Sequence, residues 1–266
     1  MFFSTRIVIK ECSENFKQLL TMSWYDFRFR YNQTKLKMLW AVLDPASQCA
    51  VFYIVFYLGM GVRSPLEDIN FLPWLLTGII PWIFISDILV GGGYSIIAAS
   101  GIILNMRYPM AIIPVGAVLT ELISHMISVL VLMALQCLWG VRYTFALGWL
   151  AYFMLCGTLF LTGYSLLFST LTVFFRDIPR IISVFVRLLY FLTPIFWSPV
   201  NENVKWLLAW NPFSFVLEGY RGAMLSQGTF DIMPWQHIYF WALTVLLLLF
   251  GSALHVRLRP YFADYL

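Results

Sequence analysis

Six long apolar runs constrain this chain more than any other feature of its sequence. They lie at 39–62, 71–99, 111–139, 148–175, 180–197 and 236–256. A membrane-spanning helix needs about 20 predominantly apolar residues, so each run is about long enough to cross a bilayer. Charged residues make up only 11% of the chain, too few to cover a soluble surface. We therefore predict an all-α integral membrane protein with six transmembrane helices.

Basic residues indicate the orientation of these spans. Most of the 17 Lys and Arg residues lie before the first run, in the second-to-third and fourth-to-fifth connections, and after the sixth run. Cytoplasmic segments of membrane proteins carry such an excess of basic residues. Because six spans bring both ends to one side, we predict a multi-pass protein of the cell (plasma) membrane with both termini cytoplasmic.

Two segments are neither spans nor ordinary loops. Residues 6–38 interleave bases with aromatic residues, which predicts an amphipathic helix on the inner membrane surface rather than a solvated tail. The apolar pieces within 198–235 are too short to span, which favours re-entrant helices. The chain thus divides into a cytoplasmic interface segment, a six-span domain and a cytoplasmic tail, at 1–38, 39–256 and 257–266.

Enzyme motifs are not found in the sequence. The cluster Gly91–Gly93 lacks the Lys-Ser/Thr of a phosphate-binding loop and lies inside the second run, where helix packing or a kink explains it better. The four cysteines lack the spacing of a metal or redox site. We therefore expect no catalysis, metal or cofactor in this chain itself, and a separate ATPase if transport is uphill.

Charged residues inside the runs are candidate functional groups. Glu121 and His125 are four apart and share a helix face; a structural pair is favoured over a proton relay or a catalytic pair. Arg187 lies within the fifth run, and ionisable groups at membrane depth usually face a bundle interior or a pathway. Pairing of Arg187 with Glu121 or Asp87 and contact with a phosphate remain open alternatives.

Two further pairs have structural interpretations. Asp44 precedes Pro45, which favours a helix start with Asp44 as the N-cap over a substrate contact. Glu218 and Arg221 are three apart on a segment too short to span, so we expect them to form an ion pair that holds a re-entrant helix.

Aromatic residues crowd the first run and the end of the fifth. Tyr and Trp combine an apolar face with a polar tip, which suits either lipid-facing packing or a path for sugar rings. The residues that we assign to a candidate path are Tyr53, Phe56, Tyr57, Tyr190, Phe191, Phe196 and Trp197.

An ordered series of motifs covers nearly the whole chain. It comprises Phe29-Arg30-Tyr31, Leu39-Trp40, Asp44-Pro45, the stretch 74–82, the stretch 105–109 with Pro114, Arg176-Asp177, the stretch 192–195, Asn211-Pro212, Glu218 and Arg221. This series resembles the permease family of type-2 ABC exporters of lipid-linked polysaccharides. The stretches 52–61, 74–86 and 254–266 look closest to the wall teichoic acid branch.

The resemblance implies an assembly of two permease copies with two ATP-binding subunits, which hold the ATP and Mg. The path between the copies would be lined by the first and fifth spans, including Arg187, and 198–235 would form its outer exit. The expected cargo is wall teichoic acid; the alternatives are another lipid-linked glycan, such as O-antigen or capsule, or an ATP-independent flippase. Membrane lipid is an expected partner, and nucleic acid is not.

The same resemblance assigns roles to individual residues. The residues expected to dock on the ATPases are Asn105, Met106, Arg107, Tyr108, Arg28 and Arg30. Structural or gating roles are expected for Asp44, Glu121, Asp177, Glu218 and Arg221.

Overall fold

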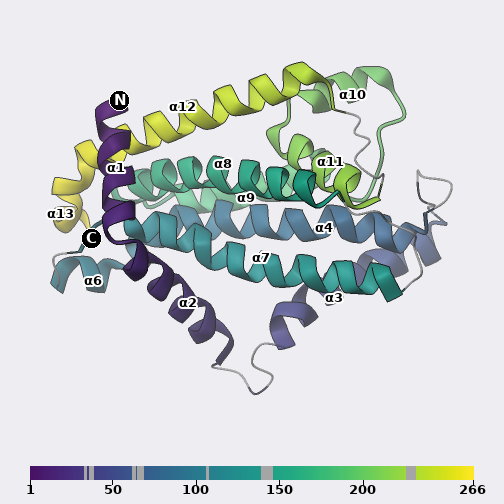
Figure 1. The fold of residues 1–266 in the computed structure, drawn as a ribbon, viewed down its shortest axis with the longest axis horizontal. Coiled ribbons are helices and arrows are strands. Elements are labelled where there is room, and N and C mark those ends of the chain that lie inside the picture. Colours follow the sequence, from purple (N-terminus) through teal and green to yellow (C-terminus); the bar gives the residue numbers. More distant parts are fainter. Residues whose placement is uncertain are drawn as a thin grey trace.

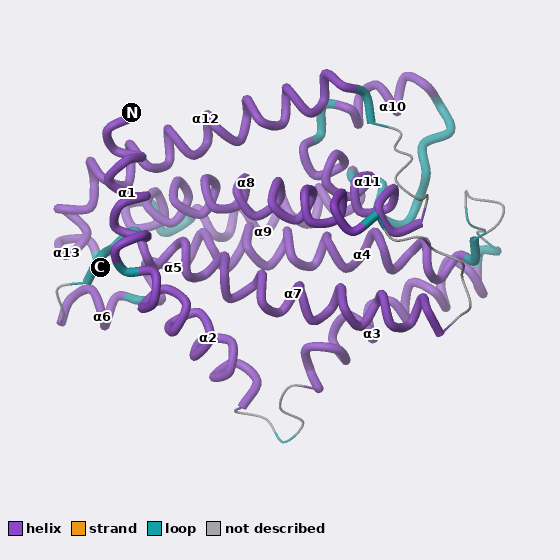
Figure 2. The backbone as a smooth tube through the Cα atoms, in the orientation of Figure 1, coloured by secondary structure: helices purple, strands orange, loops and turns teal. Residues whose placement is uncertain are grey.

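A computed structural model describes residues 1–32, 35, 39–61, 64, 69–105, 108–138, 146–225 and 232–266. All regular structure in these ranges is helical (Figure 2). Within the described ranges, four stretches are long and apolar enough to cross a membrane, namely Phe71–Asn105, Ile112–Leu138, Leu147–Phe174 and Pro234–Tyr265. They correspond to the second, third, fourth and sixth runs of the sequence and form the body of the molecule (Figure 1).

The long helices begin and end close to the limits of the apolar runs. The first of them, α4 (Phe71–Asp87), continues through the π-helical turn η3 (Ile88–Gly92) into α5 (Gly93–Ala98). The others are α7 (Ile112–Leu138), α8 (Leu147–Phe174) and α12 (Pro234–Leu258). The glycine cluster thus lies at a local irregularity of the second span.

The first and fifth runs form shorter helices. The first consists of α3 (Trp40–Phe52), about 20 Å long at 1.5 Å per residue, and the π-helix η2 (Tyr53–Gly59) that continues it. The fifth is α9 (Ile178–Leu192), about 22 Å long by the same measure. In the part of the chain that the structure describes, helix length and composition therefore identify four spans. The six predicted spans would require these two shorter helices to cross the membrane as well.

Two expected helix boundaries are wrong. The backbone of Asp44 lies inside α3, because the helix starts at Trp40, so Asp44 is not its N-cap. The fifth helix stops at Leu192 instead of continuing to 197, because Thr193 takes an extended conformation before Pro194. A residue that precedes proline is biased away from the helical region, which explains the early end.

The N-terminal segment forms two helices rather than the one expected for 6–38. They are α1 (Phe2–Glu14) and α2 (Phe16–Asn32). The first packs against α12 and the second against α7, and α2 then diverges from the bundle (Figure 1). The face of α2 that is buried consists of Leu19, Ser23 and Phe27. One side of this amphipathic segment is therefore used for packing within the protein.

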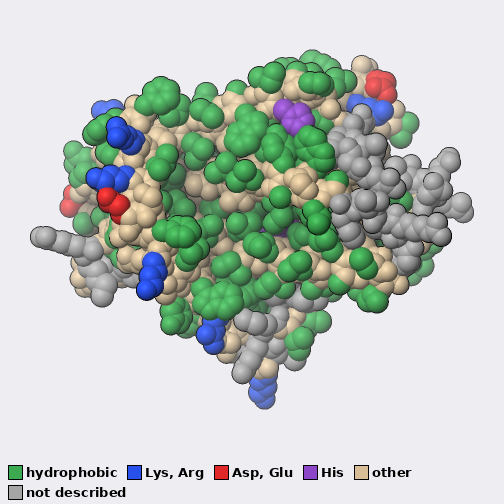
Figure 3. All heavy atoms as spheres, viewed as in Figure 1, with side chains coloured by type: hydrophobic (Ala, Val, Ile, Leu, Met, Phe, Trp, Pro, Cys, Tyr) green, Lys and Arg blue, Asp and Glu red, His purple; other side chains and the backbone are tan. Residues whose placement is uncertain are grey.

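The two ends of the bundle differ in their contents. Both termini lie at one end, together with the short helices α6 (Ser100–Asn105), η4 (Arg259–Tyr261) and α13 (Phe262–Tyr265) (Figure 1). Toward the other end lie α10 (Glu202–Ala209) and α11 (Pro212–Leu225), both too short to span. Hydrophobic side chains cover the face drawn in Figure 3, while most of its charged side chains lie near the termini and over α2.

Candidate functional site

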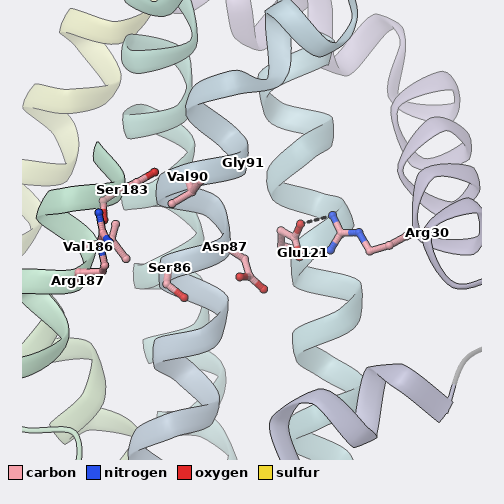
Figure 4. A pocket seen from close by; sticks show the side chains of 9 residues that line it. All are labelled: Arg30, Ser86, Asp87, Val90, Gly91, Glu121, Ser183, Val186 and Arg187. Carbon is pink, nitrogen blue, oxygen red and sulfur yellow. Dashed lines mark hydrogen bonds and ion pairs between the residues drawn. The ribbon is translucent and has the colours of Figure 1, made fainter. Parts of the chain in front are cut away.

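An open cleft of about 780 Å³ lies between α2, α4–η3, α7 and α9. Its lining residues are Arg30, Ser86, Asp87, Val90, Gly91, Glu121, Ser183, Val186 and Arg187 (Figure 4). Two bases and two acids thus meet in a largely apolar body. Sequence reasoning singled out the charged members but missed the two serines, which stand in ordinary apolar helical segments.

Arg30 and Glu121 form one wall of the cleft. Arg30 Nη1 donates to Glu121 Oε2 at 2.9 Å, and a second hydrogen bond joins Nη2 to Oε1. This two-pronged pair ties α2 to α7, and its hydrogen bonding raises the pKa of the Arg30 guanidinium above its ordinary value. Arg30 and Arg28 were both expected to dock on an ATPase. In the structure Arg30 binds Glu121 and its side chain is 47% exposed, and Arg28 is exposed as well.

The expected pair of Glu121 with His125 is wrong. His125 Nε2 lies 2.8 Å from the hydroxyl of Tyr220 on α11, and its ring stacks on Phe84 of α4 at a centroid distance of 4.5 Å. Four-residue spacing does place both side chains on one side of α7. Each then finds a partner on a different neighbouring helix, Arg30 for Glu121 and Tyr220 for His125.

Arg187 is an exposed base on the opposite wall of the cleft. Its Nε donates to the carbonyl oxygen of Ser183 at 3.3 Å, one turn earlier on α9. None of the ion pairs in the described part of the chain includes Arg187, and Glu121 is bound to Arg30. The predicted alternative in which Arg187 pairs with Glu121 is therefore wrong.

Rings from the first and fifth runs converge beside this wall. Phe56 stacks on Phe196 at 4.9 Å between ring centroids, and Phe52 lies 5.7 Å from both Phe196 and Tyr190. We call Phe52, Phe56, Tyr190 and Phe196 the aromatic cluster. Its members come from segments well over 100 residues apart in the sequence.

The remaining path residues border the aromatic cluster. Tyr53 and Tyr57 stack on each other at 4.8 Å, and Trp197 Nε1 donates to the carbonyl of Phe191 at 3.1 Å. Phe191 is 65% exposed. The structure thus brings the predicted path residues of the first and fifth runs into one region.

Both helices that carry the cluster have exposed apolar faces. On α9 the exposed residues recur at helical spacing and are Ile181, Val184, Phe185, Leu188, Phe191 and Leu192. On α3–η2 they are Trp40, Leu43, Val51, Ile54, Val55, Tyr57 and Leu58. Exposed apolar faces of this extent need lipid or another protein against them.

The segment before α7 contacts the N-terminal helices. Tyr108 donates to the sulfur of Met22 on α2 at 3.0 Å and is partly buried, whereas Asn105 is exposed and donates to the carbonyl of Gly101 at 2.8 Å. Of the other residues expected at an ATPase contact, Met106 and Arg107 lie outside the described residues.

Other expected structural residues have the following positions. Asp177 is the N-cap residue of α9 and is exposed, without a capping hydrogen bond from its side chain. The side chain of Asp44 lies outside what the structure describes. Glu218 and Arg221 form the ion pair that their spacing predicts, with Nη1 and Oε1 2.9 Å apart.

Comparison with known proteins places these features in a family. The family model described as ABC-2 type transporter matches residues 17–225. An O-antigen export system permease protein from Klebsiella pneumoniae is 27% identical over 94% of this chain and 95% of its own length. One from Myxococcus xanthus is 24% identical over 92% and 94%. A polysialic acid transport protein from Escherichia coli is 26% identical over 75% and 78%.

The family match also bears on cofactors and on the ATPase. In the described residues no group of three or more His, Cys, Asp and Glu could hold a metal ion, and the permease domain of this family binds no cofactor. The chain belongs to the ABC-2 type transporter family as a multi-pass membrane permease subunit, and the ATPase of such systems is a separate protein.

Proposed function

We propose that this chain is the transmembrane subunit of an ATP-driven exporter that moves a lipid-linked glycan from the inner to the outer face of the cell membrane. Relatives named for O-antigen export and polysialic acid transport support this substrate class. They favour an O-antigen or capsule type of glycan over wall teichoic acid. Wall teichoic acid is a narrower candidate, supported only by the resemblance of 52–61, 74–86 and 254–266 to that branch.

The observation that carries the proposal is the arrangement of Arg187 beside the aromatic cluster. A guanidinium can hold a phosphate by two parallel hydrogen bonds, and aromatic faces suit sugar rings. Arg187 precedes Tyr190 by about one helical turn on α9. Arg187 would therefore contact the charged head group, and Tyr190 and the rest of the aromatic cluster would contact the first sugars. The Tyr190 hydroxyl is buried and lacks a hydrogen-bond partner in the described part of the chain.

The proposed path lies between two copies of this chain. The apolar faces of α3–η2 and α9 are exposed on one copy, and both helices carry members of the aromatic cluster. Two copies that face each other through these helices would enclose a wider space than the helices of one copy. Two ATP-binding subunits would dock at the end that holds both termini, near Arg28, Asn105 and Tyr108, which makes that end cytoplasmic.

Substitutions of Arg187 test the phosphate contact. Arg187→Lys keeps the charge but cannot form two parallel hydrogen bonds to a phosphate. Stimulation of ATP hydrolysis by lipid-linked glycan should therefore fall about tenfold, which is the effect of losing roughly one hydrogen bond to a charged group. Arg187→Ala should abolish the stimulation while basal hydrolysis and thermal stability in detergent are retained. The matched control is Arg180→Ala, which removes an exposed base from the same helix.

Two outcomes would contradict this role of Arg187. One is full stimulation of the Arg187→Ala variant by the lipid-linked glycan. The other is an unstable Arg187→Ala variant that Glu121→Gln rescues, which would show a buried ion pair instead. The structure predicts no such rescue, because Glu121 binds Arg30.

A further inference from the structure

Arg221 on α11 joins three parts of the fold with one side chain. Its Nη1 donates to the carbonyl oxygen of Pro194 at 2.6 Å and to Glu218 Oε1 at 2.9 Å, and its Nη2 donates to the carbonyl oxygen of Ile195 at 2.6 Å. Its guanidinium carbon lies 4.2 Å from the ring centroid of Trp74 on α4. Arg221 is 6% exposed. The ion pair with Glu218 is thus only one of four contacts.

The two carbonyl groups belong to the segment in which α9 ends. Thr193 is extended, and the chain then turns sharply, with the Ile195 amide donating to the Thr193 carbonyl at 2.7 Å. Carbonyl groups past a helix end lack intrahelical partners and are costly to bury unpaired. The planar fork of Arg221 satisfies two of them at once. Asn211, just before α11, adds a bond from Nδ2 to Thr193 Oγ1 at 3.1 Å.

Gly78 on α4 provides the space for this arrangement. A Cβ added at Gly78 would lie 2.5 Å from the carbonyl oxygen of Ile195 and 2.8 Å from Arg221 Nη2. The first of these atoms is backbone, so relief would require the segment 193–196 to move. Trp74, one turn earlier on α4, lies under the same guanidinium. The fit therefore depends on α4 as well as on α11.

The next residue, Phe196, is a member of the aromatic cluster. It is 8% exposed and stacks on Phe52 and Phe56 of the first run. We propose that Arg221 is a positioning residue: by binding the carbonyls of Pro194 and Ile195 it holds Phe196 in the aromatic cluster and fixes the end of α9 against α3–η2. That this cluster contacts glycan rests on the proposed function; the positioning itself does not.

Two conservative variants separate positioning from a simple ion pair. Arg221→Lys keeps a positive charge beside Glu218 but cannot bind two carbonyls and a carboxylate in one plane. Glu218→Gln removes the ion pair but leaves both carbonyl contacts, and its amide oxygen can still accept from Arg221. Positioning predicts that Arg221→Lys is the damaging change, whereas an ion pair alone predicts that Glu218→Gln is.

The direct readout is the proximity of Phe56 and Phe196 in the full chain. In a background with the four native cysteines replaced by alanine, Phe56→Cys and Phe196→Cys are cross-linked by a short bifunctional maleimide in membranes. We expect Arg221→Lys to lower the rate of cross-linking about tenfold, which is the effect of losing roughly one hydrogen bond to a charged group. Glu218→Gln should leave the rate within twofold of that of the parent chain. Equal rates in both variants, or the reverse order, would overturn the proposal.

A second substitution tests the same geometry from α4. Gly78→Ala should lower the cross-linking rate as Arg221→Lys does. Its matched control is Gly157→Ala on α8, where an added Cβ would make ordinary contacts of 3.6 and 3.9 Å. An unchanged rate in Gly78→Ala would contradict the proposal even if Arg221→Lys failed to fold.

Glycan-stimulated ATP hydrolysis, measured with the same Arg221 and Glu218 variants in the native-cysteine chain, separates the two proposals. Loss of stimulation together with the cross-linking change supports both. A cross-linking change without any effect on stimulation supports positioning by Arg221 and counts against the role of the aromatic cluster in the path.

Discussion

Arg30 and Glu121 show how single charged residues are accommodated in this apolar body. Glu121 is nearly buried, with a side chain 11% exposed, whereas that of Arg30 is 47% exposed. A buried carboxylate that loses its partner keeps its desolvation cost. The four-residue spacing correctly puts Glu121 and His125 on one side of α7, but spacing along one helix does not reveal a partner on another. That is why the sequence pointed to His125 and not to Arg30, which lies on α2.

A double-mutant cycle measures this pair. Arg30→Met should destabilise the protein by roughly 1–3 kcal/mol, because a nearly buried carboxylate is left unpaired while Arg30 is half exposed. The combination with Glu121→Gln should be milder than the sum of the single changes. Thermal unfolding in detergent gives the values, and Lys10→Met, in an exposed pair with Glu14, is the near-neutral control. Strictly additive losses would rule out the coupling.

The sequence predicted the existence of the long helices more accurately than the points at which some helices end or break. The four long apolar runs gave α4, α7, α8 and α12 with boundaries close to those observed, because a long apolar stretch at membrane depth must be helical. The early end of α9 and the break at Asn15 between α1 and α2 were not predicted. The first depends on Thr193 before Pro194, a local effect inside an otherwise apolar run, and the second on the single residue Asn15.

The crossing of α8 and α12 depends on two glycines. A Cβ at Gly251 would lie 2.7 Å from the carbonyl oxygen of Gly163, and one at Gly163 would lie 2.8 Å from the amide nitrogen of Leu248. Small residues allow membrane helices to approach this closely. Gly251→Ala should therefore destabilise the protein by about 1–3 kcal/mol through overpacking, as measured by thermal unfolding in detergent.

The control for this crossing is Gly148→Ala near the start of α8, where an added Cβ would meet nothing within 4 Å. It should be neutral or slightly stabilising, since alanine favours a helix more than glycine does. Equal stability of Gly251→Ala and Gly148→Ala would show that the helices can separate without cost.

The whole molecule has its charge and its exposed apolar faces in different places. Most charged side chains on the face in Figure 3 lie near the termini and over α2, whereas α9 and α3–η2 present apolar residues along one side. The sequence predicted that the first and fifth runs share a function, and the structure brings their rings together. It could not predict that Arg221 and Gly78 on two other helices shape the end of α9, because those contacts involve backbone carbonyls that no side-chain pattern reveals.

The proposed export function can be measured as ATP-dependent movement of a lipid-linked glycan across a vesicle membrane. Vesicles would contain this permease, its ATP-binding subunit and a lipid-linked glycan of O-antigen, capsule or teichoic acid type, with ATP and a membrane-impermeant glycosidase added outside. We expect ATP to protect at least one glycan from the enzyme, because complexes whose ATPases face outward move it inward, and we expect Arg187→Ala to prevent this protection. A complex that hydrolyses ATP but protects none of the three glycans would contradict the proposed function.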